Sequence, residues 1–119
     1  MGLDISFNKI QRKRLKDFRK VNFLVGFFEK RGMRREHGCW FPSIEEIQEL
    51  LDACNQVLKD HNKAKDLLPT ISGFLFGNYE YNDIYFNSVE QVKEFCEETL
   101  IPKLKALDDD EYIEFAISY

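Results

Sequence analysis

The chain has 119 residues, about the length of one domain, and is 44% hydrophobic and 32% charged, which excludes a disordered or low-complexity protein. No apolar run approaches the roughly 20 residues of a membrane span, and the first residues do not have the pattern of a secretory signal. We therefore expect one globular domain over residues 1–119, located in the cytoplasm and without a membrane partner.

The net charge of -4 conceals a strong difference between two parts of the chain. Residues 1–36 hold eleven Lys/Arg and four Asp/Glu, whereas residues 37–119 hold six Lys/Arg and seventeen Asp/Glu. Such a division is typical of a charged binding surface, or of two parts that neutralise each other in the folded protein. The sequence leaves both interpretations open.

The first two predicted elements are a strand and a basic helix. Alternating apolar and polar residues predict a half-buried strand over residues 2–8. Between about residues 10 and 30, apolar residues recur at the spacing of one helical face, namely at Phe18, Val21, Leu24, Val25 and Phe28. Basic residues follow another face and could contact nucleic-acid phosphates. The candidate contacts are Arg12, Lys13, Lys16 and Lys20.

Residues 39–68 predict a short extended segment followed by two helices. Residues 39–41 form the extended segment, and Ser43 with Glu46 has the spacing of a capping box, so a helix should begin there and run to about Asp60. Its apolar positions are Ile47, Leu50, Leu51, Cys54 and Leu58. A second, short helix over residues 62–68 should stop before Pro69.

Residues 70–87 contain two glycines and six aromatic residues without a helical period, and we expect a structured loop there. A second capping box at Ser88 and Gln91 predicts a helix to Leu100. Pro102 should kink or restart this helix because proline lacks an amide donor. Alternation over residues 113–117 predicts a final strand.

Together these elements predict an α+β fold with three main helices. Neither terminal strand is stable alone, so we expect residues 2–8 to pair antiparallel with residues 112–118. Residues 39–41 are a candidate extension of this small sheet, and the helices should cover one of its faces.

The sequence contains no recognisable catalytic or metal-binding motif. It lacks a nucleophile elbow, a phosphate-binding loop and a zinc-protease helix, so we expect a protein that is not an enzyme. The pair His37 and Cys39 lacks the other half of a zinc site, so no metal or cofactor is expected. Three cysteines suit reduced thiols, and Cys54 and Cys96 should lie in the core.

Three segments of the chain form a distinctive set: Met-Gly-Leu-Asp at residues 1–4, Phe-Arg-Lys-Val-Asn at residues 18–22, and Leu-Leu-Pro-Thr-Ile-Ser-Gly-Phe-Leu-Phe-Gly-Asn-Tyr-Glu-Tyr at residues 67–81, followed by Tyr85 and Phe86. This set resembles a group of small bacteriophage and prophage proteins that begin Met-Gly-Leu-Asp and carry a Leu-Pro-Thr-x-Ser-Gly-Phe-x-Phe-Gly loop. The resemblance implies a phage or prophage accessory protein acting in the cytoplasm of a bacterial host. It implies no catalytic residue. The chain departs from the group in its short basic link after the first strand and in Pro102.

The aromatic loop is the part of the chain that we expect to carry function. We predict that Tyr79, Tyr81 and Tyr85 are accessible, and that Glu80 and Asp83 form the polar rim of a partner-binding patch. Residues 74 and 76, both phenylalanine, should instead be buried. The competing interpretation is that the aromatic residues only anchor a long connection.

Three function hypotheses follow. The leading one is a non-enzymatic phage accessory protein that binds a host or phage protein, for example as an anti-CRISPR-like inhibitor of a host nuclease complex, because acidic side chains compete with phosphates for a basic channel. The alternative is a module that sequesters a small ligand, such as a nucleotide, at the glycine–aromatic loop. The third is nucleic-acid binding through the basic first helix.

Overall fold

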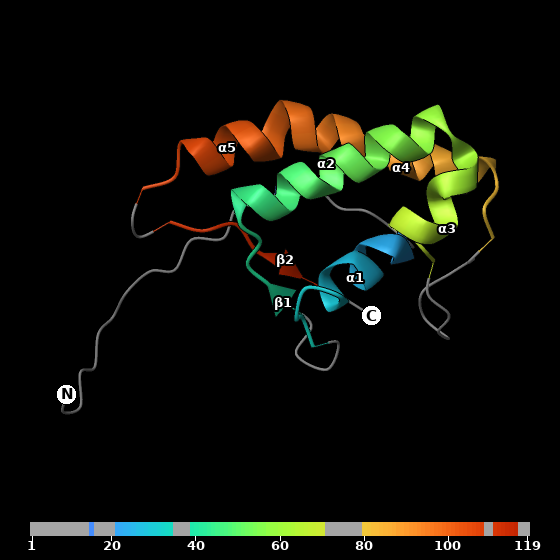
Figure 1. The fold of residues 1–119 in the computed structure, drawn as a ribbon. Helices are drawn as coiled ribbons and strands as arrows, with labels where there is room; N and C mark the ends of the chain where they lie inside the picture. The colour runs from blue at the N-terminus through green and yellow to red at the C-terminus, as the bar shows by residue number, and fades with distance from the viewer. Residues whose placement is uncertain (1–14, 16–20, 35–38, 71–79, 109–110, 117–119) are drawn as a thin grey trace.

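The computed structural model describes residues 15, 21–34, 39–70, 80–108 and 111–116, and the account below concerns these residues. They form a mostly helical α+β fold with a small antiparallel sheet, which confirms the predicted fold class (Figure 1). The elements in chain order are α1 (Asn22–Glu29), β1 (Cys39–Trp40), α2 (Ile44–Lys59), the 3₁₀-helix η2 (His61–Lys63), α3 (Ala64–Leu67), α4 (Asp83–Phe95), the π-helix η3 (Cys96–Leu100), α5 (Ile101–Lys105) and β2 (Phe115–Ala116). No helix within the described ranges is both long enough and apolar enough to cross a membrane.

The longest helices form the upper layer in Figure 1, where α2 lies alongside α4, η3 and α5. Their buried side chains form most of the core, and these are Ile47, Leu50, Ala53, Cys54 and Val57 from α2, and Tyr85, Val89, Val92, Cys96 and Leu100 from α4 and η3. The predicted apolar face of α2 is confirmed at its centre. Val57 is fully buried, however, while Leu51 and Leu58 lie at the margin and are only partly buried.

The capping box predicted at the start of α2 is present. The Ser43 hydroxyl accepts from the Glu46 amide at 3.2 Å, and one Glu46 carboxylate oxygen accepts from the Ser43 amide at 3.0 Å. The other Glu46 oxygen accepts from the Trp40 indole nitrogen at 3.1 Å. One carboxylate therefore caps α2 and holds β1 against it.

Burial in α1 is not confined to one face, because every residue in 23–28 is buried. The layer of longer helices lies over α1 (Figure 1), and Phe115 of β2 packs on Phe28. The helix also begins later than predicted: Val21 has the non-helical angles φ -91° and ψ 78°, and Leu15 is not helical. Residues 10–14 and 16–20 of the predicted helix lie outside the described residues.

A glycine ends α1. Gly32 has φ +117°, its amide donates to Glu29 O at 3.1 Å, and the Met33 amide donates to Phe28 O at 3.0 Å. These two bonds are the pair found in a Schellman motif, and the buried side chains of Met33 and Phe28 complete it. The Trp40 ring packs on Gly32, since a Cβ added there would lie 3.3 Å from Trp40 Cη2.

The sheet joins β1 and β2 in antiparallel register, with Cys39 opposite Ala116 and Trp40 opposite Phe115. The expected C-terminal strand is thus present, paired with the segment that we considered as an extension of the sheet. The expected pairing with residues 2–8 lies outside the described residues. The Phe115 ring packs on the Phe28 ring with 4.7 Å between centroids, which fixes the sheet to α1.

Two predicted features of the C-terminal half are wrong. The loop does not extend to Asn87, and Ser88 does not cap a helix, because α4 already begins at Asp83 with the Asn82 side chain accepting from the Tyr85 amide at 3.1 Å. Ser88 lies inside α4 and donates to Ile84 O at 3.0 Å. An Asn cap is as favourable as a Ser cap, and burial of Tyr85 extends the apolar face of the helix one turn toward its N-terminus.

The predicted disturbance at Pro102 is confirmed. Directly before it, the Ile101 amide donates to Cys96 O, five residues back, and η3 takes the π conformation. Pro102 follows as the second residue of α5 inside this continuous run of α4, η3 and α5, where it has no amide to donate to the preceding turn. The short helix expected over residues 62–68 is also present, as η2 and α3.

Candidate functional site

Two tyrosines join the end of α3 to the start of α4. The Tyr81 hydroxyl accepts from the Thr70 amide at 3.1 Å, and the Tyr85 hydroxyl donates to Leu68 O at 2.6 Å. The two rings meet edge to face with their centroids 5.0 Å apart. Residues 68–70 and 81–85 are therefore held together on both sides of the segment 71–79, which lies outside the described residues.

This arrangement corrects part of the predicted partner-binding patch. Tyr85 is only 6% exposed, so the prediction that it is accessible is wrong. It begins the buried face of α4 and packs edge to face on Phe23 with 5.5 Å between centroids. Burial raises the pKa of Tyr85, and the neighbouring Tyr81 adds to this effect.

The other members of the predicted patch have different positions. Tyr81 is half-buried, while Glu80 and Asp83 are exposed, as expected for a polar rim. Tyr79, Phe74 and Phe76 lie outside the described residues, as do all four predicted nucleic-acid contacts: Arg12, Lys13, Lys16 and Lys20. The described part of the patch thus reduces to one half-buried tyrosine between two exposed carboxylates.

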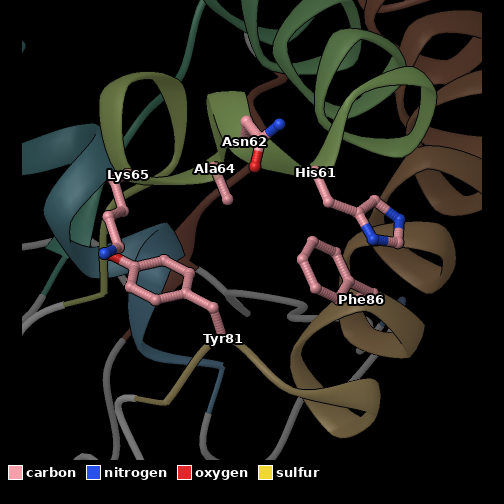
Figure 2. Close-up of a pocket in the computed structure, with 6 residues that line it drawn as sticks. All are labelled: His61, Asn62, Ala64, Lys65, Tyr81 and Phe86. Carbon is pink, nitrogen blue, oxygen red and sulfur yellow. The ribbon is translucent and has the colours of Figure 1, made fainter.

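Tyr81 also lines an open hollow of about 310 Å³ between η2–α3 and the start of α4. Its lining residues are His61, Asn62, Ala64, Lys65, Tyr81 and Phe86 (Figure 2). The His61 ring stacks on Phe86, with 3.7 Å between centroids and 12° between planes. Lys65 Nζ lies 5.8 Å from the centroid of the Tyr81 ring. Figure 2 shows the Tyr81 and Phe86 rings on two sides of the hollow, with Ala64 between them.

Three polar groups at this hollow have no partner in the part of the chain that the structure describes. They are the His61 ring nitrogens, the Asn62 side-chain amide and the Lys65 ammonium group, which makes only the contact with the Tyr81 ring. Sequence analysis did not bring these residues together. The three lie in one five-residue stretch of η2 and α3, but their meeting with Tyr81 and Phe86 depends on how that stretch packs against the start of α4, which no local spacing encodes.

A second candidate surface is formed by carboxylates on the long helices. Within the described ranges, two ion pairs involve them: Arg31 to Glu49 at 2.6 Å, and Lys93 to Glu97 at 3.3 Å. Several exposed carboxylates on α2, α4 and η3 have no ion-pair partner among these residues, namely Glu45, Asp52, Glu90, Glu94 and Glu98. The Arg31 pair shows complementarity between the basic and acidic parts of the chain at one point, whereas the five carboxylates named above have no ion pair within the described ranges.

The buried thiols were correctly placed by their spacing. Cys54 and Cys96 are fully buried, whereas Cys39 is partly exposed. Burial raises the pKa of both core thiols, that of Cys96 to about 12, with the Glu97 charge as a secondary cause there. These two thiols are therefore protonated at neutral pH and act as small apolar core groups.

Within the described segments, no three side chains of His, Cys, Asp or Glu lie close enough together to hold a metal ion. His37, half of the pair considered above, is outside those segments. Comparisons with protein-family models, curated proteins and solved structures found no match to this chain.

Proposed function

We propose that this protein is a non-enzymatic accessory protein of phage or prophage origin that binds a basic surface on another protein. The partner is a nucleic-acid-binding protein of the bacterial host, such as a nuclease complex used in defence. Binding of the present protein would inhibit this partner. The phage origin is supported by the resemblance of residues 1–4, 18–22 and 67–81 described above.

The observation that carries the proposal is the set of exposed carboxylates on α2, α4 and η3 that have no ion-pair partner among the described residues. Packed helices fix the backbone positions of these carboxylates, so only their side chains have to be ordered when they oppose a basic surface. Glu90, Glu94 and Glu98 follow one another at intervals of four residues, about 6 Å along the axis at 1.5 Å per residue. A basic nucleic-acid channel attracts such a row through the electrostatics that attract phosphates.

The partner-binding residues expected from the sequence fit this proposal in part. Glu80 and Asp83 are exposed beside Tyr81 and add negative charge at the N-terminal end of α4. Tyr79 stays a prediction, and Tyr85 is withdrawn as a contact because it is buried. Nucleic-acid binding through the basic residues near the N-terminus stays a separate prediction, which the experiment below distinguishes.

The test is capture of host proteins on the immobilised full chain, with the lysate treated with nuclease. The expected result is capture of basic proteins that double-stranded DNA or heparin displaces. Salt above 0.15 M should weaken their binding, since salt screens charges beyond about 8 Å at that concentration. The triple variant Glu90→Gln/Glu94→Gln/Glu98→Gln should lose this capture. Changes from Glu to Gln at exposed sites should alter stability by less than about 0.5 kcal/mol.

The matched control changes exposed, uncharged residues on the same helix, Asn87→Ala/Gln91→Ala, and should capture as the parent does. Capture that survives the triple variant unchanged would contradict the proposal. Capture that disappears after nuclease treatment would instead indicate a nucleic-acid partner.

A further inference from the structure

The hollow between α3 and α4 points to a second activity that does not depend on the acidic helices. We propose that it binds a small ligand that combines a planar aromatic ring with an anionic group. The proposal rests on three features of the described lining: its aromatic rings, its polar groups without a partner among the described residues, and the Lys65 cation.

The aromatic half of the ligand would contact Tyr81, Phe86 and His61. The His61–Phe86 stack presents two parallel rings as one unit, and the hydrogen bond from the Thr70 amide holds Tyr81 in place. Side chains already held in position lose little freedom when a ligand binds. Contacts between aromatic side chains and planar bases are a common means of binding such rings.

The anionic half would contact Lys65. Its ammonium group lies at the edge of the hollow over the Tyr81 ring and has no ion pair among the described residues. The nearby carboxylates Asp60 and Asp66 do not line the hollow, and Asp60 Oδ1 accepts from the Asn62 backbone amide at 3.1 Å. Among the described residues, the lining therefore carries one positive charge and no negative one.

The size and polar lining limit the ligand further. A volume of about 310 Å³ lies at the lower end of the range of about 300–1,000 Å³ that holds small ligands. The free nitrogens of His61 and the Asn62 amide can accept and donate hydrogen bonds to ring substituents. A nucleoside monophosphate and a small aromatic carboxylate share this chemistry.

The test is isothermal titration of the full chain with four probes: AMP, adenosine, inorganic phosphate and indole-3-acetate. AMP or indole-3-acetate should bind more tightly than adenosine or inorganic phosphate. The tighter of these two probes shows whether the anionic group of the ligand is a phosphate or a carboxylate. Lys65→Met should weaken binding about tenfold, the loss expected for one charge-assisted contact.

The matched control is Lys63→Met, which removes an exposed lysine of η2 that does not line the hollow and should leave the affinity unchanged. Phe86→Leu should weaken binding of the ring, with thermal melting used to confirm that the variant is folded. No binding of AMP or indole-3-acetate at millimolar concentration would overturn the proposal. Equal binding of AMP and phosphate, or equal weakening by Lys63→Met and Lys65→Met, would also overturn it.

Discussion

The hydroxyl of Tyr85 should contribute to stability out of proportion to its size. It donates to Leu68 O at 2.6 Å, and both residues are buried, so Tyr85→Phe removes the donor and leaves the carbonyl without it. An unsatisfied buried acceptor costs about 1–3 kcal/mol. We expect the free energy of unfolding to fall by about 2 kcal/mol and the melting temperature to fall by about 8 °C for a chain of this size.

The control for this change is Tyr112→Phe. Tyr112 is 62% exposed, and its hydroxyl has no partner in the described part of the chain. Its removal should change stability by less than about 0.5 kcal/mol. Urea and thermal unfolding of both variants measure the difference. If both variants have the same free energy of unfolding, the hydrogen bond from Tyr85 to Leu68 does not stabilise the junction of α3 and α4.

The same residue has a pH signature. Because burial raises the pKa of Tyr85, the folded protein keeps this phenol neutral at a pH where the unfolded chain ionises it. Its contribution is fully present below pH about 10, the ordinary tyrosine value, and is lost as pH rises further. The stability difference between the parent and Tyr85→Phe should therefore narrow above pH 10, and a constant difference would contradict the buried position.

Two further predictions test other parts of the core. Cys39, which is partly exposed, should react with a thiol reagent well before Cys54 and Cys96, and equal labelling rates in the folded protein would argue against their burial. Gly32→Ala should cost about 1–2 kcal/mol, because a side chain is unfavourable at φ +117° and its Cβ would lie 3.3 Å from the Trp40 ring. The exposed change Asn55→Ala provides the comparison, and equal melting of these two variants would contradict the strained turn.

Local signals in the sequence were sufficient for α2. Its capping box involves residues three apart, and its apolar face repeats within a single helix, so neighbouring residues determine both. The same spacing predicted the buried positions of Cys54 and Cys96. The fold class could be predicted because apolar and polar residues alternate near the ends of the chain, whereas apolar residues recur at helical spacing between them.

Features that depend on distant contacts were missed. The start of α4 was predicted too late because an aromatic residue, Tyr85, belongs to the core through its contacts with Phe23 and Leu68, which lie far away in the chain. The hollow joins His61 to Phe86 across the packing of two helices. The pattern of residues along the chain identifies which of them are apolar, but it does not identify which of them are in contact in the folded protein.

Trp40 is the single tryptophan of the chain, and its surroundings make it a local optical reporter. Its indole contacts Gly32 after α1 and donates to Glu46 at the start of α2, so its emission reports on the junction of α1, β1 and α2. The hollow lies beyond the other end of α2, a helix of 16 residues and about 24 Å in length. Fluorescence can therefore follow opening of this junction, whereas a ligand in the hollow should leave the signal unchanged and must be detected by heat or NMR.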